Sequence, residues 1–336
     1  MNFISVESPG NVRVLKRPKI MRKENEVLLR MRYGGICGSD LGTYLGTFAY
    51  SKYPCIPGHE LAAEIVECPE NEKSLASGML VTVNPYFNCG TCYSCRRGLV
   101  NCCSDNQTMG VQREGGFVEY LTMPISRVIP GGALSADKLV LIEPFAIGWH
   151  GIGKASIQPG DRVLVIGAGT IGIFAAMSAR LKGGTVTLCD ISSEKLERAK
   201  LFGFRDFIHN TDKDSFTRQI GSDGFDVTVE AVGLPSTFQD CLDAAAYGGR
   251  VIVIGVGKKN LDFNFTLIQK KELQIFGSRN AVTADFTQLI ELCNQGKIDL
   301  DGIVTDVFPY EQADDAFKAF SEHRDSKLKV LLKFGE

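Results

Sequence analysis

The second half of the chain alternates short apolar runs with amphipathic stretches of helical length. The run RVLVI precedes a glycine turn and an apolar helical stretch, and TVTLCD precedes SSEKLERAKLFG, which begins with serine and ends with glycine. Short apolar strands that alternate with helices are typical of a parallel, doubly wound α/β sheet. We predict such a domain over residues 148–280, with strands at 162–166, 185–190, 225–233, 250–257 and 272–278.

The first part of the chain has a different pattern. Its runs VLLRMRYGG, AAEIVE and FVEYLTM are short and partly alternating, and glycine and proline are frequent. This pattern predicts an irregular, mostly antiparallel β domain over residues 1–147 with long functional loops. Residues 281–336 carry an amphipathic helix and a final strand that a six-strand sheet does not need, so we expect them to return to the first domain.

Composition excludes several classes of protein. The 336 residues are 44% hydrophobic and 23% charged with a net charge of −2, which argues against disorder and against a general binder of nucleic acids or membrane surfaces. The N-terminal segment lacks the apolar core of a signal peptide, and no apolar run is long enough to span a bilayer. We expect a cytoplasmic protein, where its 11 cysteines indicate metal binding or catalysis more often than disulfides.

A glycine motif follows the strand at 162–166. Residues 167–172, GAGTIG, fit G-x-G-x-x-G between a strand and a helix, where the backbone approaches a pyrophosphate and the helix N-terminus stabilises it. Asp190 closes the next strand and can bind the adenosine ribose, which favours NAD over NADP, although Lys195 nearby keeps some use of NADP open. The alternative is a glycine turn without a ligand. The expected cofactor-binding residues are Gly167, Gly169, Thr170, Ile171, Gly172, Asp190 and Lys195.

Four cysteines in a loop over about residues 88–104 have the spacing of a metal site. Cys89, Cys92 and Cys95 are followed seven residues later by Cys103, and four thiolates can close a tetrahedral structural zinc site. Such a zinc would stabilise a loop with little apolar core. The Cys-Pro of ferredoxin spacing is absent, which disfavours an iron–sulfur cluster. Cys102 adjoins Cys103, and the spacing does not decide which of the two binds; four unligated thiols are the other alternative.

Two further segments carry candidate ligands for a second zinc. Cys37 lies in GICGSD and His59 in PGHE, and a thiolate and an imidazole on separate loops can hold one zinc with a carboxylate and an open fourth position. From the residues alone, a single cysteine and a single histidine are more often core residues.

The order of these motifs resembles a known family. From about residue 25 onward the chain carries GICGSD, PGHE, C-x-x-C-x-x-C-x7-C, GGFVEY, IEPFAIGWH, GAGTIG, Asp190 and GSRN. In this it resembles the zinc-dependent medium-chain alcohol/polyol dehydrogenases, especially those for sugar alcohols and sugar acids such as sorbitol, galactitol and L-galactonate. The resemblance implies a GroES-like first domain, a Rossmann second domain, two zinc ions per chain, NAD, and a homodimer or homotetramer.

The resemblance also implies roles at the second zinc site. Cys37 and His59 are its expected ligands, with Glu143 as the third ligand and Glu60 as the alternative. Asp40 is expected to orient the ligand histidine.

Ser39 is expected to take the substrate proton. Gly42 stands where many relatives have a histidine that ends the proton relay, so the relay must finish through ribose hydroxyls, water or another group.

Further positions are assigned to the cofactor and the substrate by the same resemblance. The residues expected to line the cofactor are Ile254, Gly255, Val256, Ser278 and Asn280. Arg279 is expected to face the substrate, where it could bind a carboxylate or polyol hydroxyls, and its alternative is a surface salt bridge. Tyr44 is expected beside the substrate, with loop packing as the alternative.

Together these features predict a zinc-dependent NAD oxidoreductase that oxidises a secondary hydroxyl of a polyol or sugar acid, a hexonate or hexitol, to the ketone. A threonine-type dehydrogenase of hydroxy-amino acids is the nearest alternative. A zinc-free quinone reductase would lack the cysteine motifs, and a zinc-ribbon module that binds nucleic acid would not need the glycine motif. A redox sensor built on the clustered thiols is the remaining alternative.

Overall fold

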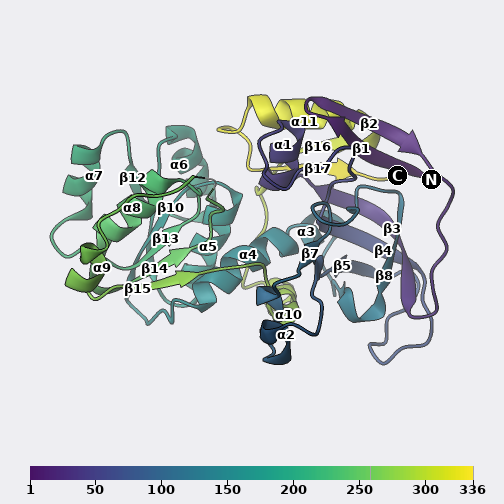
Figure 1. The fold of residues 1–336 in the computed structure, drawn as a ribbon, viewed down its shortest axis with the longest axis horizontal. Helices are drawn as coiled ribbons and strands as arrows, with labels where there is room; N and C mark the ends of the chain where they lie inside the picture. Colours follow the sequence, from purple (N-terminus) through teal and green to yellow (C-terminus); the bar gives the residue numbers. More distant parts are fainter. Residues whose placement is uncertain (258, 336) are drawn as a thin grey trace. The chain divides into compact units, whose positions relative to one another are not determined.

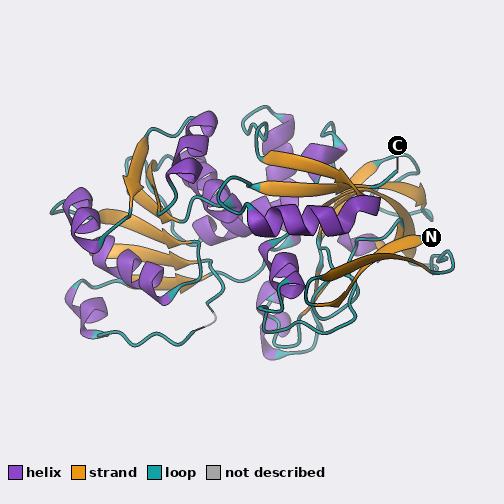
Figure 2. Ribbon diagram, turned by 90° about the horizontal axis from the view of Figure 1, so that it is seen from above, coloured by secondary structure: helices purple, strands orange, loops and turns teal. Residues whose placement is uncertain are grey.

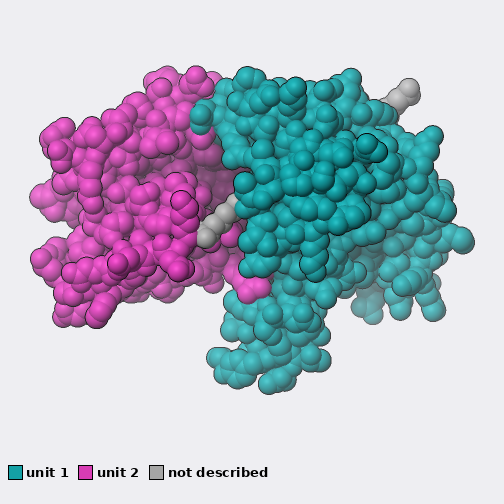
Figure 3. All heavy atoms as spheres, turned by 45° about the horizontal axis from the view of Figure 1, so that its top comes forward, with its two compact units in different colours: residues 1–143, 281–336 teal, residues 144–280 magenta. Residues whose placement is uncertain are grey.

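The computed structural model describes residues 1–257 and 259–335, and it divides into two compact units (Figures 1 and 3). Unit 1 comprises Met1–Glu143 and Ala281–Glu336, and unit 2 comprises Pro144–Asn280. Unit 1 is therefore built from two segments that are distant in the sequence. Within the described residues, no helix combines the length and the apolar character needed to cross a membrane.

Unit 2 contains a six-stranded sheet in the order β12-β11-β10-β13-β14-β15, and all neighbouring strands are parallel. The five runs predicted from the sequence form five of these strands, and β12 is a sixth that was not predicted; the α/β doubly wound fold class is confirmed. The strands are β10 (Arg162–Ile166), β11 (Thr185–Asp190), β12 (Asp206–His209), β13 (Phe225–Glu230), β14 (Ala245–Val253) and β15 (Gln274–Gly277).

Helices connect these strands (Figure 2). Ser192 and Asp212 begin α6 and α7 because their side chains accept hydrogen bonds from the backbone N–H groups of Lys195 and Ser215. The connecting helices are α5 (Thr170–Leu181), α6 (Ser193–Ala199), α7 (Lys213–Ile220), α8 (Pro235–Ala244) and α9 (Thr266–Lys270), with a 3₁₀ turn η3 (Lys200–Phe202); α4 (Ile142–Gly153) precedes the first strand, and its first two residues belong to unit 1.

Unit 1 contains a seven-stranded sheet in the order β16-β17-β3-β4-β5-β9, in which β8 also pairs with β3. All pairs are antiparallel except β16 with β17, so the predicted irregular, mostly antiparallel domain is confirmed. Two small antiparallel pairs, β1 with β2 and β6 with β7, complete it. The strands are β1 (Asn2–Ser8), β2 (Asn11–Lys16), β3 (Glu26–Gly35), β4 (Glu60–Glu67), β5 (Leu80–Val83), β6 (Tyr86–Phe87), β7 (Gln107–Thr108), β8 (Tyr120–Pro124), β9 (Val128–Pro130), β16 (Val304–Pro309) and β17 (Lys329–Lys333).

The second segment of unit 1 supplies part of its core. Phe317, on α11, is fully buried, and its ring lies 5.5 Å from Tyr44 and 6.5 Å from Phe117. The helices of this unit are α1 (Gly38–Tyr44), α2 (Tyr93–Arg96), α3 (Ala136–Leu139), α10 (Thr283–Asn294) and α11 (Ala313–Glu322), with 3₁₀ turns η1 (Val100–Cys102), η2 (Ile125–Arg127) and η4 (Tyr310–Gln312).

Candidate functional site

The pairing of β3 with β4 brings two candidate ligands together in unit 1. Gly35 near the end of β3 pairs with Glu60 at the start of β4, so Cys37 and His59 leave the sheet side by side. The ligand atoms of Cys37, His59 and Glu60 all lie within 4.8 Å of one another. His59 and Glu60 are buried and Cys37 is half-buried. This geometry fits a metal ion held by sulfur, nitrogen and oxygen.

The imidazole of His59 is in a setting that fits a bound cation. Its Nδ1 atom is buried and has no hydrogen-bond partner among the described residues. Burial lowers the pKa of His59, but the negative charges of Cys37 and Asp40 outweigh this and raise it well above its ordinary value. A metal dication would neutralise the same negative potential.

Asp40 connects the two ligand loops. Its Oδ2 atom accepts a hydrogen bond from the backbone N–H of Cys37 at 2.9 Å, and Oδ1 accepts one from Gly58 at 3.2 Å. The sequence predicted that Asp40 orients the ring of His59. In the structure its carboxylate accepts hydrogen bonds from the backbones of Cys37 and Gly58, so Asp40 fixes the spacing of the two loops, and its effect on the ring of His59 stays a prediction.

Glu60 forms a buried ion pair with Lys329 of β17. The Nζ atom of Lys329 lies 2.7 Å and 2.6 Å from the two carboxylate oxygens, and it also donates to the backbone oxygen of Ile36. Burial lowers the pKa of Lys329, but the charge of Glu60 outweighs this effect and leaves the pKa raised. Sequence analysis missed Lys329. The signal was a charged residue at an inward position of the apolar strand KLKVLLKF.

Glu143 is a further buried carboxylate in this region, beside Asp40 and Glu60. It lies in the first turn of α4 and accepts a hydrogen bond from the hydroxyl of Tyr86. Burial raises the pKa of Glu143 to about 7, although the charge of His59 acts to lower it. Burial also raises the pKa of Tyr86 well above its ordinary value. Both candidate third ligands therefore have a partner within unit 1, Lys329 for Glu60 and Tyr86 for Glu143.

Helix α1 carries three more of the predicted residues. Ser39 is half-buried in its first turn, next to Cys37. A Cβ atom at Gly42 would lie 3.1 Å from the Cβ atom of Phe48, so Phe48 takes part of the space that a relay side chain would need. Tyr44 is buried against Phe317 in the core, and this contact gives it a packing role.

The four-cysteine cluster forms in the loop that contains α2. The Sγ atoms of Cys89, Cys92, Cys95 and Cys103 lie within 4.8 Å of one another. Backbone N–H groups of Cys95 and Ser104 lower the pKa of Cys92 to about 5, which favours the thiolate form that zinc binds. Cys102 is exposed and lies outside the cluster. The structure thus selects Cys103 over Cys102, which the spacing alone could not do.

The glycine turn of unit 2 has the geometry that a pyrophosphate needs. Gly167 has a φ of 105°, and a Cβ atom at Gly172 would lie 1.6 Å from the backbone oxygen of Gly167. A Cβ atom at Gly169 would meet open space, so this side of the turn is accessible. The carboxylate of Asp190 accepts hydrogen bonds from Ala168 at 2.7 Å and from Ser192 at 2.9 Å. Asp190 is therefore fixed against the turn.

The remaining predicted cofactor residues also lie in unit 2. Ile254 is buried and Val256 is 69% exposed, on either side of Gly255. The Oγ atom of Ser278 and the Nδ2 atom of Asn280 are buried without a hydrogen-bond partner among the described residues. Unpartnered buried polar atoms after a parallel strand fit a bound polar group. Arg279 between them is exposed.

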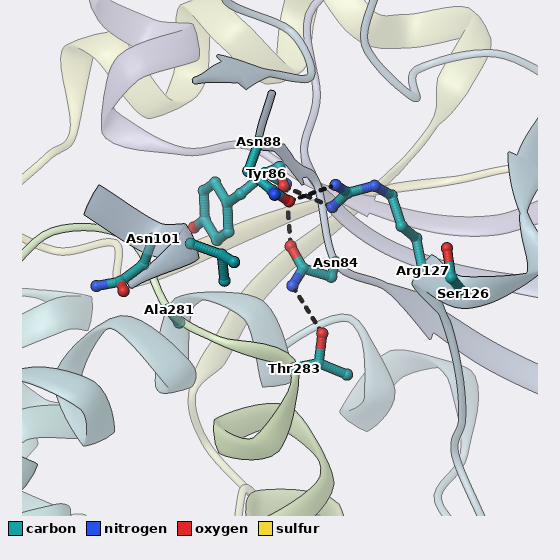
Figure 4. Close-up of a pocket in the computed structure, with 9 residues that line it drawn as sticks. Asn84, Tyr86, Asn88, Asn101, Ser126, Arg127, Ala281 and Thr283 are labelled. Carbon is teal, nitrogen blue, oxygen red and sulfur yellow. Dashed lines mark hydrogen bonds between the residues drawn. The ribbon is translucent and has the colours of Figure 1, made fainter. Parts of the chain in front are cut away.

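Unit 1 also contains a polar cavity of about 180 Å³ beside Tyr86 (Figure 4). Asn84 donates to Thr283 at 3.0 Å and accepts from the backbone of Tyr86, while Arg127 donates to Asn88 at 3.1 Å. These bonds link several of the lining groups to one another. Sequence analysis did not predict this cavity, because its lining comes from separate segments: Asn84, Tyr86, Asn88, Val100, Asn101, Ser126, Arg127, Ala281 and Thr283.

Comparison with known proteins agrees with both units. Residues 23–133 match the family model of the alcohol dehydrogenase GroES-like domain, and residues 170–295 match that of the zinc-binding dehydrogenases. The chain is 32% identical to the L-galactonate-5-dehydrogenase of Escherichia coli K12 over 99% of both chains. It is 33% identical to a sorbitol dehydrogenase of Bacillus subtilis, covering 92% of this chain and 90% of the relative.

A solved structure shows the same fold. It is a short chain alcohol dehydrogenase from Escherichia coli CFT073 complexed with NADH, with 30% identity, a TM-score of 0.92 and coverage of 99% of both chains. The folds and motifs of the two units therefore define an oxidoreductase that acts on CH–OH groups. The chain belongs to the zinc-type medium-chain alcohol/polyol dehydrogenase family, as its motif order predicted.

Proposed function

We propose that this protein is a zinc-dependent NAD oxidoreductase that oxidises a secondary hydroxyl of a polyol or sugar acid to the ketone. The observation that carries the proposal is the convergence of Cys37, His59 and the buried carboxylate of Glu60 within 4.8 Å in unit 1. The accessible glycine turn of unit 2 supports the cofactor. The relatives named for L-galactonate and sorbitol support the substrate class.

The residues of the site have distinct tasks in this reaction. Bound zinc would act as a Lewis acid on the substrate hydroxyl, and NAD would accept the hydride. Cys37 and His59 hold the metal, while Asp40 keeps their loops at a fixed spacing. Ser39 accepts the substrate proton and passes it outward. Because residue 42 is a glycine, ribose hydroxyls, water or another group must complete this path.

For the third metal ligand we propose Glu143, with Glu60 as the alternative. Glu60 has both oxygens bound to an ammonium, whereas Glu143 accepts from a neutral hydroxyl. An ion pair competes with a metal for a carboxylate more strongly than a neutral hydrogen bond does. Arg279 is proposed to bind a substrate carboxylate or hydroxyls.

Metal content measured together with activity tests the proposal. The wild type should contain two zinc ions per chain, as its two ligand clusters require. Cys37→Ala should lose one zinc and all activity while keeping its circular dichroism spectrum, and Glu143→Gln should behave alike while Glu60→Gln keeps the metal. Equal loss of both metals in Cys37→Ala, or retained activity, would contradict the assignment.

The preference for NAD is proposed to depend on the charge of Asp190. Asp190→Asn keeps an oxygen that can accept from the turn but removes the charge that repels a 2′-phosphate, so the ratio of kcat/KM for NAD over NADP should fall about tenfold. Asp190→Ala should lower the same ratio and weaken both cofactors, because the hydrogen bonds of Ala168 and Ser192 are lost as well. Unchanged ratios in both variants would exclude this role.

The substrate is best identified by NADH formation at alkaline pH across hexonates, hexitols, inositols and threonine. Hexonates or hexitols should give the highest kcat/KM. Exclusive turnover of threonine would favour the hydroxy-amino-acid alternative, since one relative is an L-threonine 3-dehydrogenase.

We also propose a cytoplasmic homo-oligomer. Two thiol-based metal sites suit a reducing compartment. β15 is an edge strand with Ile275 exposed, and it could pair with a second copy across a two-fold axis. Light scattering after gel filtration would distinguish dimer, tetramer and monomer.

A further inference from the structure

Glu230, the last residue of β13, is a buried acid at the carboxyl edge of the parallel sheet. Its side chain is 1% exposed. One oxygen, Oε1, accepts hydrogen bonds from the backbone N–H of Val232 at 2.9 Å, the backbone N–H of Gly233 at 2.7 Å and the hydroxyl of Thr237 at 2.7 Å. A single carboxylate oxygen therefore holds the whole turn between β13 and α8.

The turn that follows β14 packs on the same carboxylate. The backbone oxygen of Glu230 accepts from Ile254 at 2.9 Å and from Gly255 at 3.1 Å. A Cβ atom at Gly255 would lie 2.3 Å from Oε2 of Glu230 and 2.3 Å from the nitrogen of Gly233. No side chain fits between the two turns. Glu230 thus joins them: its carboxylate holds the first turn and lies against Gly255 of the second, and its backbone oxygen holds the second turn.

These two turns present apolar side chains at the carboxyl edge. Val232 is 45% exposed and Val256 is 69% exposed. The glycine turn is adjacent, since a Cβ atom at Gly167 would lie 2.7 Å from a methyl group of Val232. Exposed apolar groups beside a glycine turn, at the carboxyl ends of parallel strands, form the kind of surface on which the rings of a dinucleotide bind.

We propose that Glu230 is a positioning residue for the dinucleotide: it fixes Val232 and Val256 as two apolar walls of the binding surface. It does so through the two turns, without touching the ligand. This inference rests on the proposed function, in which unit 2 binds the cofactor. Without the carboxylate, three donors lose their acceptor, and the turns must be ordered again whenever the ligand binds.

Variants of Glu230 separate its geometry from its charge. Glu230→Ala should raise the Kd for NADH, measured by fluorescence titration, at least tenfold, which corresponds to about 1.4 kcal/mol. Glu230→Gln keeps the reach and an accepting oxygen, and it should bind within about threefold of wild type. Glu230→Asp keeps the charge but is shorter, and it should bind about as weakly as the alanine variant. The KM for NAD should rise in parallel, while kcat changes less.

Asp226 provides a matched control on the same strand. It lies towards the opposite end of β13 and accepts a hydrogen bond from the backbone N–H of Arg162 at 2.8 Å. Asp226→Ala should leave the Kd for NADH unchanged, with a loss of thermal stability similar to that of Glu230→Asp.

The measured affinities for NADH decide whether Glu230 has this role. Wild-type affinity in both Glu230→Asp and Glu230→Ala overturns the proposal, as does equal weakening in Asp226→Ala, which would indicate a general effect on the sheet. If Glu230→Ala does not fold, the Kd values of Glu230→Asp and Glu230→Gln for NADH are compared instead, and equal values would overturn the proposal. Failure of the wild type to bind NADH would instead overturn the proposed function.

Discussion

The ion pair of Lys329 and Glu60 shows how one residue can stabilise a site from a distant part of the chain. The two side chains are 4% and 1% exposed and lie 2.6 Å apart. Removing two charges from water costs free energy, which their mutual attraction and the bond to Ile36 offset. Either charge without the other would be buried without compensation and would destabilise the fold.

Replacing Lys329 tests this dependence. Lys329→Met should lower the free energy of unfolding by about 3–5 kcal/mol in urea titrations, because the carboxylate of Glu60 stays buried without its partner. Lys327 is the control. It pairs with Asp306 at 2.7 Å in a more accessible position, so Lys327→Met should cost about 1 kcal/mol or less. Equal losses in the two variants would show that the burial of the pair is unimportant.

At the scale of elements, the four-cysteine loop lacks a core of its own. Helix α2 has no buried residue, and the adjoining turn η1 buries only Asn101. Elements this short are not stable by themselves in water. Bound zinc would therefore supply most of the energy that keeps this loop folded.

Cys102 and Cys103 are neighbours in the sequence, but only Cys103 lies in the cluster, so variants of the two can show which thiol binds zinc. Cys103→Ser should release the zinc of this loop and make the loop sensitive to proteolysis, while the zinc bound by Cys37 remains. Cys102→Ser should keep two zinc ions and resist proteolysis like the wild type, because Cys102 is exposed outside the cluster. Metal analysis and limited proteolysis measure both effects. The opposite result would exchange the roles of the two cysteines.

The elements also show what could be predicted from the sequence. The parallel strands, the glycine turn and the spacing of the cysteines depend on residues close together in the chain, so they could be predicted. The partners of the carboxylates of Glu60 and Glu143 could not be predicted in this way. Lys329 lies 269 residues from Glu60, and Tyr86 lies 57 residues from Glu143. Such contacts depend on strand register and packing, which no local pattern encodes.

At the scale of the whole molecule, the two units can be followed separately. Phe317 belongs to the core of unit 1, whereas the single tryptophan, Trp149, belongs to unit 2. Tryptophan fluorescence therefore reports on unit 2, and release of zinc to a chromogenic chelator reports on unit 1.

Truncation of one core ring should affect one unit. Phe317→Ala should destabilise unit 1 by about 3–5 kcal/mol and move zinc release to lower urea concentration. The fluorescence transition of unit 2 should stay within about 0.5 kcal/mol of wild type, as should both transitions of Phe265→Ala, because Phe265 is exposed. A common shift of both signals would mean that the units unfold as one.

The order of segments in unit 1 has a consequence for its synthesis. β3 pairs with β17. Because β3 is synthesised early and β17 begins at Lys329, β3 lacks this partner until nearly 300 further residues have been added. Unit 2, whose strands all lie between residues 162 and 277, can fold in the meantime. Until then the edge of β3 that receives β17 stays open to pairing with other nascent chains. The site of Cys37 and His59 thus acquires Lys329 only after β17 has been synthesised.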